Sequence, residues 1–248
     1  MKDLKYLFVV PKTRVVKLAS PSFNYGRNWC HKTPPEIKDK EGSLQTLVCG
    51  FEAAEVATKD YEKKFNAYCM KNEKEFLLLF QKMCVLDYVI RNTDRNMKNL
   101  FVKYFSYEPF QIVLTDNGLA FPVKHPKKKP YAWEKLSWAY KPLNQELRQQ
   151  LLTLFTPTFV HELCEEVKQL FLQDCQHDTY LTDRQIYVLL GQIWNLKDAL
   201  EANHPPADWV KRKPFLATPR FSRTPPANGT FDDCFRRLPA DYSHRGCC

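Results

Sequence analysis

Three polar residues between positions 84 and 122 have the chemistry of a phosphoryl-transfer site: Asp94, Asn99 and Asp116. Phosphoryl transfer needs a carboxylate to position the attacking hydroxyl, and oxygen ligands to hold Mg²⁺ against the phosphates. Asp94 can fill the first role, and Asn99 and Asp116 the second. The alternative is that these residues, with Asn92, only form turns, since Asn and Asp favour turns and Asp-Asn-Gly is typical of a hairpin.

The order and spacing of these residues favour chemistry over turn formation. Asn99 lies five residues after Asp94, and Asp116 begins an Asp-Asn-Gly sequence further along the chain. Protein kinases have the same layout, with a metal-binding Asn five positions after the catalytic Asp and an Asp-x-Gly after the intervening hairpin. Each motif is weak by itself because such turns are common. Their ordered combination is more specific.

Two strand-like segments separate the two halves of this pattern. Residues 99–105 (NLFVKYF) and 110–114 (FQIVL) are rich in β-branched and aromatic residues and predict a hairpin with its turn at Glu108 and Pro109. Such a hairpin brings Asp116 back beside Asn99. Two oxygen ligands would then lie together at one end of the strand pair.

The remaining periodicity predicts mostly helices. The apolar run over residues 73–91 predicts a buried helix that delivers the Asp94 loop to a cleft. Thr182 and Asp183 are a plausible N-terminal cap for a later helix. Helices are predicted over residues 52–70, 73–91, 144–155, 157–174 and 182–202. Strands are predicted earlier in the chain over residues 6–10, 14–18 and 44–51.

Composition narrows the class of protein. The 248 residues are 44% hydrophobic, as in a globular protein, and carry a net charge of +9, which indicates an acidic partner such as phospholipid or nucleic acid. Nine cysteines without a Cys-x-x-Cys pair indicate neither a zinc site nor a disulfide framework, so we expect a reducing, cytosol-facing location. No run is long enough for a signal peptide or a membrane span, and membrane contact is expected to be peripheral.

Residues 124–140 mix basic and aromatic side chains. The ones we expect at a membrane surface are Lys127, Lys128, Lys129, Tyr131, Trp133 and Trp138. Aromatic rings favour the lipid–water interface, and lysines are attracted to anionic headgroups. The same mixture also suits single-stranded nucleic acid, or a solvated loop whose aromatic rings pack on the core.

The chain changes character after residue 203. Residues 204–248 are rich in proline and basic residues with little periodicity, so we predict a largely disordered tail. The tail ends in Cys247 and Cys248, which are candidates for lipid attachment because stable anchoring requires two signals.

An ordered series of motifs resembles type II phosphatidylinositol 4-kinases over roughly residues 7 to 215. The motifs are VPKTRVVKLASPSFNY, GSLQTLVCGF, LDYVIRNTDR, DNGLAFPVKHP, GQIWNLKDAL and RKPF. The resemblance implies an α+β, protein-kinase-like fold, mainly the helical C-lobe with a remnant of the N-lobe sheet. It divides the chain into N-lobe strands and hinge (1–50), C-lobe (51–203) and tail (204–248).

The resemblance also implies roles for individual residues. The hinge that receives the adenine of ATP would be Gln45, Thr46, Leu47 and Val48. The catalytic loop would be residues 91–99, where Asp94 accepts the proton of the inositol hydroxyl beside Arg95, while Asn99 and Asp116 carry Mg²⁺. Residues 114–140 would form the activation loop and the membrane-facing surface.

The implied activity is ATP-dependent phosphorylation of phosphatidylinositol at its 4-hydroxyl. By resemblance, it would take place on the anionic cytosolic face of Golgi or endosomal membranes, and no nucleic acid is expected as a partner.

Three departures from the family pattern bear on activity. Lys98 replaces an acidic residue next to the metal site, the loop over residues 25–42 is shorter, and no glycine-rich loop or phosphate-binding lysine precedes the hinge. The family's cysteine-rich lipidation run is also missing, for which Cys247 and Cys248 are a candidate substitute. These features favour a truncated isoform, an incomplete gene model or a divergent paralogue. The alternative function is therefore a catalytically inactive, kinase-derived membrane-binding or scaffold protein.

Overall fold

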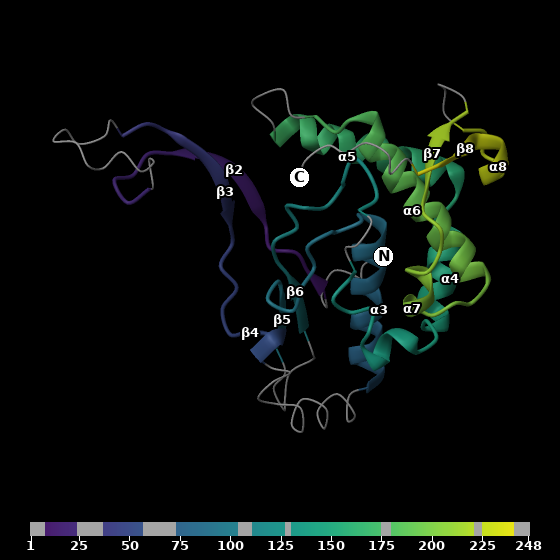
Figure 1. The fold of residues 1–248 in the computed structure, drawn as a ribbon, viewed down its shortest axis with the longest axis horizontal. Coiled ribbons are helices and arrows are strands. Elements are labelled where there is room, and N and C mark those ends of the chain that lie inside the picture. The colour runs from purple at the N-terminus through teal and green to yellow at the C-terminus, as the bar shows by residue number, and fades with distance from the viewer. Residues whose placement is uncertain are drawn as a thin grey trace.

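The computed structural model of the protein describes residues 8–23, 37–56, 73–103, 111–126, 130–174, 180–220 and 225–240. These residues form a mixed α+β fold with small sheets, as predicted. A central helix, α3 (Glu73–Val89), lies between a four-stranded sheet on one side and helices α6 (Asp183–Glu201) and α7 (Pro206–Trp209) on the other (Figure 1).

The four-stranded sheet contains the predicted hairpin. Strands β5 (Leu100–Lys103) and β6 (Gln111–Leu114) pair antiparallel, with Leu100 opposite Leu114. The sheet is completed by β4 (Glu52–Ala53) beside β5 and by β1 (Phe8–Val9), which runs parallel to β6. The side chains of β6 at positions 112–114 are all buried, which fits an apolar strand covered on both faces. The predicted turn at Glu108 and Pro109 lies outside the described residues.

Helix α3 is apolar nearly all round, so it is buried at the centre of the core, as predicted. Leu79, Met83 and Cys84 are fully buried along it. The three later helices also lie within one residue of their predicted bounds. They are α4 (Gln145–Leu154), α5 (Pro157–Asp174) and α6.

Local side-chain chemistry explains where these helices begin and end. The Asn144 side chain accepts a hydrogen bond from the Leu147 amide at the start of α4. Thr182 and Gln185 form a capping box at the start of α6, which confirms the predicted cap. At the other end of α6, Nε of Arg148 donates to the carbonyl oxygen of Leu200 and binds α4 to that terminus. Hydrogen bonds from side chains satisfy the backbone groups that the first and last turns of a helix leave unpaired.

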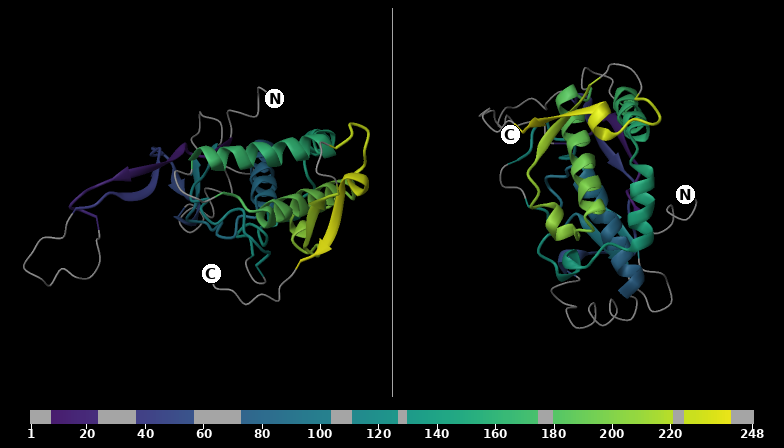
Figure 2. Two further views of the ribbon diagram at one scale, coloured as in Figure 1. Left: turned by 90° about the horizontal axis from the view of Figure 1, so that it is seen from above. Right: turned by 90° about the vertical axis from the view of Figure 1, so that its right-hand side faces the viewer.

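The basic, proline-rich tail is ordered over most of its length, and the prediction of disorder is wrong there. Strands β7 (Phe215–Pro219) and β8 (Phe235–Pro239) form a hairpin with α8 (Phe231–Cys234) and lie across α6 (Figure 2). Leu216, Ala217 and Phe235 are buried in this contact. A short hairpin needs few apolar residues to fill its inner face. The proline-rich, basic composition of the tail therefore did not indicate that the tail packs against α6.

The first hairpin projects away from the body of the molecule. Strands β2 (Thr13–Leu18) and β3 (Lys40–Gln45) pair antiparallel, and Figures 1 and 2 show them extending from the four-stranded sheet. The strand predicted over residues 44–51 is misplaced. The observed strand β3 lies earlier in the chain, because the polar sequence KEGSLQ pairs through its backbone with β2. The helix predicted over 52–70 begins with β4 instead, and residues 57–70 lie outside the described ranges.

Gly191 is the point where α6 and β7 approach most closely. A Cβ at Gly191 would clash with the backbone carbonyl of Phe215. We expect Gly191→Ala to lower the free energy of unfolding by about 1–3 kcal/mol, because the hairpin backbone must shift to make room. Urea unfolding measures this change. Gly42→Ala is the control, since a Cβ at Gly42 meets nothing; equal stability of the two variants would contradict the close approach.

Candidate active site

The loop that follows α3 is shaped by backbone turns and asparagine side chains. Arg91 ends the helix with a left-handed φ of +47°. Asn92 is buried, and its Oδ1 accepts a hydrogen bond of 3.0 Å from the amide of Asp94. Asn side chains commonly hold a turn in this way. The turn-forming reading of Asn92 is therefore correct, and its turn fixes the backbone of the predicted catalytic residue.

Backbone contacts bring the two halves of the predicted site together. Nδ2 of Asn99 donates to the carbonyl oxygen of Asp94 at 3.2 Å, and the Thr115 amide donates to the carbonyl oxygen of Asn99 at 3.1 Å. Asp116 follows directly, with a left-handed φ of +49° that Asp tolerates better than most residues. The prediction that the hairpin brings Asp116 back beside Asn99 is confirmed at the level of the backbone.

Arg95 holds these segments together from inside the protein. Its side chain is 1% exposed, and its Nε donates to both carboxylate oxygens of Asp87 at 3.0 and 3.1 Å. Nη1 donates to the carbonyl oxygens of Asn99 (2.9 Å) and Thr115 (2.8 Å), and Nη2 donates to Oδ1 of Asn117. A guanidinium used in this way cannot reach a substrate. The assignment of Arg95 as a catalytic residue is therefore corrected: it is a positioning residue.

Asp87, the partner of Arg95, was not identified from the sequence. Its carboxylate is fully buried on α3 and also accepts a hydrogen bond from Nε1 of Trp133. Burial raises the pKa of Asp87 to about 6, against the opposing effect of Arg95 and the hydrogen bond from Trp133, so the carboxylate is ionised at neutral pH. The available signal was a lone acidic residue inside an apolar helix, which requires a buried partner.

The carboxylates of Asp94 and Asp116 do not help to hold the described structure together. Within the described ranges, neither forms a hydrogen bond or an ion pair. Asp116 is exposed and Asp94 is half-buried. Both carboxylates are therefore available to a ligand.

The oxygen atoms around Asp116 fit Mg²⁺ bound together with a phosphate. No cluster of three or more His, Cys, Asp or Glu side chains that could hold a metal occurs in the part of the chain that the structure describes. Magnesium in nucleotide sites needs only one or two protein oxygens, because phosphates and water complete its shell. Asp116 supplies a carboxylate, and Asn99 retains its Oδ1 because its Nδ2 is the atom that bonds to Asp94.

The predicted adenine-binding segment lies at the base of the projecting hairpin. Gln45 ends β3 and donates through Nε2 to Oγ1 of Thr13, while the Thr46 amide donates to the carbonyl oxygen of Lys12. Leu47 is 83% exposed, and Val48 is partly buried. The segment is anchored by its backbone and presents an apolar side chain to solvent. Its role with adenine stays a prediction.

The aromatic residues predicted to face a membrane are part of the core. Tyr131 and Trp133 are 4% and 1% exposed and stack with their ring centroids 4.6 Å apart. Trp138 packs edge-on against Phe76 at 4.8 Å. The assignment of Tyr131 and Trp133 to a membrane surface is therefore wrong, because composition cannot tell which way a ring points, and Trp138 is only partly buried against the same core. Lys127, Lys128, Lys129, Cys247 and Cys248 lie outside the described residues.

Another surface beside Asp116 has exposed apolar side chains. Leu119 and Val123 are 55% and 49% exposed in the segment that leads away from Asp116. The neighbouring Leu119 carbonyl oxygen accepts hydrogen bonds from the amide and hydroxyl of Thr93. These contacts hold the exposed apolar segment against the loop that carries Asp94.

His125 connects the segment after Asp116 to the tail hairpin. Its Nε2 lies 3.2 Å from the carbonyl oxygen of Phe215 and donates to it as a neutral ring. Burial, helped by Arg91 and Arg184, lowers the pKa of His125 to about 4, against the effect of the hydrogen bond.

This burial predicts a loss of stability in mild acid. The unfolded chain binds the His125 proton near pH 6.5 and the folded protein only near pH 4. The unfolded state therefore binds more protons between these values, so stability falls as the pH falls through this window. At pH 5 we expect His125 to lower the free energy of unfolding by about 2 kcal/mol relative to pH 7.

Urea unfolding of the wild type and of His125→Gln at both pH values measures this effect. The glutamine amide can still donate to Phe215 but does not titrate, so the variant should lose less stability at pH 5. Identical pH dependence of the two proteins would contradict the assignment, since the other titrating groups are common to both.

Comparisons with known proteins identify relatives over most of the chain. A family model described as phosphatidylinositol 3- and 4-kinase matches residues 6–187. A chicken (Gallus gallus) phosphatidylinositol 4-kinase type 2-beta is 33% identical over 83% of this chain and 51% of its own length. A Xenopus laevis phosphatidylinositol 4-kinase type 2-alpha is 30% identical over 96% of this chain and 58% of its own length. The chain spans about half the length of such relatives. Among its described helices, none is both long and apolar enough to cross a membrane.

Proposed function

The chain belongs to the phosphatidylinositol 3- and 4-kinase family, and we propose that it transfers the γ-phosphate of ATP to the 4-hydroxyl of phosphatidylinositol. The observation that carries this proposal is the buried Asp87–Arg95 pair, through which one guanidinium bonds to the backbone at Asn99 and Thr115. This arrangement supports the proposal because it holds the three proposed site residues at the same end of the β5–β6 hairpin. They are Asp94, Asn99 and Asp116.

Asp94 would bind and orient the attacking hydroxyl and accept its proton. Its backbone is fixed on both sides, by Asn92 at the amide and by Asn96 and Asn99 at the carbonyl oxygen. A carboxylate with a fixed backbone and no competing partner is suited to hold a hydroxyl in line with a phosphate.

Asn99 and Asp116 would hold Mg²⁺ on the phosphates, and the bound metal would neutralise their charge. Residues 45–48 would contact the adenine. Lys98 is exposed to solvent, so its reversed charge is hydrated and weakened at the metal position. The replacement at Lys98 is therefore compatible with the proposed site.

The family also supports a division of the fold. We assign the β2–β3 hairpin and residues 45–48 to a small part of the N-lobe and hinge of a protein-kinase-like fold, and the elements from α3 to α6 to its C-lobe. We propose the exposed Leu119 and Val123, which lie close to Asp116 in the sequence, for peripheral contact with the cytosolic face of a membrane. They replace the aromatic residues assigned from the sequence.

A lipid kinase assay tests the proposal directly. Purified full chain is incubated with Mg²⁺, radiolabelled ATP and phosphatidylinositol vesicles, with Asp116→Ala as the control. We expect phosphatidylinositol 4-phosphate from the wild type, and less from the variant by about 10²-fold or more, since removing one charge-stabilising group typically has this effect. No product above the variant, with both proteins folded, would overturn the proposal.

A thermal-shift titration with Mg-ATP distinguishes the proposed kinase from the alternative, a catalytically inactive scaffold protein. A ligand that binds only the folded state raises the melting midpoint by mass action. A Mg²⁺-dependent rise without product would identify a nucleotide-binding protein that has lost transfer. No rise and no product would favour a scaffold.

A further inference from the structure

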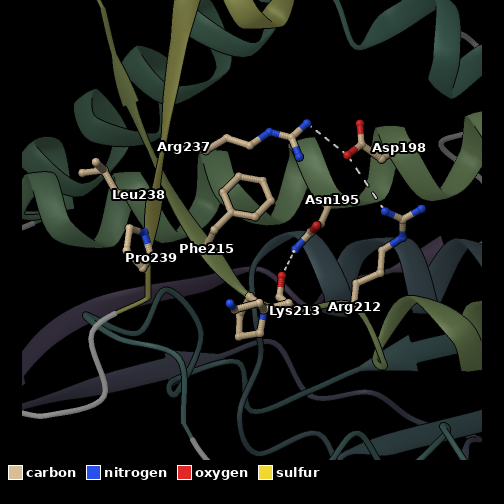
Figure 3. Close-up of a pocket in the computed structure, with 9 residues that line it drawn as sticks. Asn195, Asp198, Arg212, Lys213, Phe215, Arg237, Leu238 and Pro239 are labelled. Carbon is tan, nitrogen blue, oxygen red and sulfur yellow. Dashed lines mark hydrogen bonds and ion pairs between the residues drawn. The ribbon is translucent and has the colours of Figure 1, made fainter.

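A cavity with both charged and apolar side chains lies between α6 and the tail hairpin, away from the loop of Asp94. Its volume is about 460 Å³, within the range of small-molecule sites. Figure 3 shows its charged lining: Arg212, Lys213 and Arg237 with a single carboxylate, Asp198. None of its lining residues belongs to the loop of Asp94 or to the segment of Asp116.

The charges in this cavity are unbalanced. Asp198 lies between the two guanidinium groups, at 3.1 Å from Nη2 of Arg237 and 3.9 Å from Nη1 of Arg212 (Figure 3). One carboxylate shared in this way leaves an excess of two positive charges, including the exposed Lys213. An anion that carries close to two negative charges would complete the site.

Arg237 is held in a fixed orientation. Its guanidinium carbon lies 4.1 Å from the ring centroid of Trp194 and 5.0 Å from that of Phe215. Stacking uses the faces of the guanidinium, whereas its N–H donors lie in its plane. Only one of these donors is committed to Asp198. Arg237 therefore presents donors that are already oriented before a ligand binds.

Arg212 adds a donor that the fold leaves unsatisfied. Its Nε is buried and has no hydrogen-bond partner among the described residues. Leaving a buried donor without an acceptor is unfavourable, so such groups in native proteins often indicate a site for a ligand or an ion. Because this Nε is closed to solvent, an anion in the cavity would bind the Nη groups of Arg212, of which Nη1 lies 3.9 Å from Asp198.

The rest of the lining is apolar and limits the ligand class. Phe215, Leu238, Pro214 and Pro239 form the wall beside the basic side chains. A simple inorganic ion would leave this wall without contacts. An organic phosphomonoester carries a charge of about −1.5 to −2 at neutral pH and three acceptor oxygens, together with a carbon skeleton.

We propose that this cavity binds an organic phosphomonoester, with the phosphate between Arg212, Lys213 and Arg237 and the organic part against Phe215 and Leu238. The shared chemistry can come from a soluble sugar or glycerol phosphate, or from the headgroup of a phosphorylated lipid. Binding here goes beyond the proposed kinase reaction and requires no nucleotide.

Isothermal titration of the full chain with glycerol 3-phosphate at constant ionic strength tests the soluble source. We expect Arg212→Gln and Lys213→Gln each to weaken binding by about tenfold, the loss typical of one charge-assisted hydrogen bond. The Lys213 side chain forms no hydrogen bond or ion pair with the residues that the structure describes, so Lys213→Gln should stay folded and keeps the test valid if Arg212→Gln is unstable. Lys211→Gln is the matched control, because Lys211 is adjacent, exposed and paired with Asp208 outside the cavity.

Cosedimentation with vesicles tests the lipid source. Phosphatidylcholine vesicles containing phosphatidic acid, a lipid phosphomonoester, are compared with vesicles containing phosphatidylserine. If the Arg212 and Lys213 variants bind vesicles with phosphatidic acid more weakly, but vesicles with phosphatidylserine as well as the wild type does, the ligand is a lipid headgroup. If the variants weaken only the binding of glycerol 3-phosphate, the ligand is soluble. No binding in either experiment, or an equal loss in Lys211→Gln, would overturn the proposal. Neither experiment contains ATP, so its result is independent of the kinase proposal.

Discussion

Asp94→Asn is expected to reduce phosphorylation of phosphatidylinositol by about 10²–10⁴-fold, the usual contribution of a positioned general base. The amide has nearly the same shape as the carboxylate but cannot accept the proton of the hydroxyl. The loss should appear in kcat rather than in KM, because Asp94 acts on the reacting hydroxyl in the transition state. Initial rates at several concentrations of phosphatidylinositol measure the two constants.

The same substitution should leave the fold intact. All the hydrogen bonds of Asp94 to described residues involve its backbone, which the substitution keeps. We therefore expect the free energy of unfolding to change by no more than about 0.5 kcal/mol. Asp232→Asn is a matched control, since it makes the same chemical change at an exposed position on α8. If Asp94→Asn retained the rate of this control, Asp94 would be only a turn residue.

The grouping of the three proposed site residues was predictable because it depends on their spacing along the chain. Asp94, Asn99 and Asp116 could be placed together once the apolar strand pattern between them indicated a hairpin. The long helices were also predictable, since α3 has a continuous apolar run and α6 has both a strong period and a capping box.

Burial of individual side chains was harder to predict. Trp133 and Tyr131 follow a lysine run, and their composition fits an interface as well as a core; only the packing against α3 decides. Arg95 has the sequence context of a catalytic-loop residue, yet its partner Asp87 lies on the preceding helix. A pair joined across the end of a helix has no fixed sequence spacing, so the acidic residue inside the apolar helix indicates that a buried partner exists but not which residue it is.

The tail hairpin could not be predicted because its contribution comes from tertiary contacts. Its two strands and α8 are short, and their apolar residues show no period that distinguishes them from a linker. Trp194 on α6 packs against Phe215, Phe231 and Phe235, and these contacts order the hairpin. The result is a structured support for α6 and for His125, in place of a disordered end.

Asp87→Asn is expected to lower the free energy of unfolding by about 3–5 kcal/mol, because it leaves the Arg95 guanidinium buried without a counter-charge. The pKa of Asp87 is raised because the loss of hydration on burial outweighs the attraction of the carboxylate to Arg95. The pair is therefore not a large source of stability as a whole, but removing only one partner is costly. For a chain of this size the melting midpoint should fall by roughly 6–20 °C.

The control is Asp208→Asn, which makes the same change in the exposed pair with Lys211. An exposed pair contributes at most about 1 kcal/mol, so this variant should melt close to the wild type. Equal stability of the Asp87 and Asp208 variants would contradict the role of the buried pair.

A double variant separates stability from positioning. Asp87→Leu with Arg95→Met removes both charges and should recover stability relative to Asp87→Asn, since an apolar pair of similar volume can replace a buried ion pair. It should not recover activity, because methionine cannot donate to the carbonyl oxygens of Asn99 and Thr115 that Arg95 binds. Lipid phosphorylation measured well below the melting midpoint of each protein tests this. Recovery of activity together with stability would show that the hairpin and its turns hold Asp94, Asn99 and Asp116 in place without Arg95.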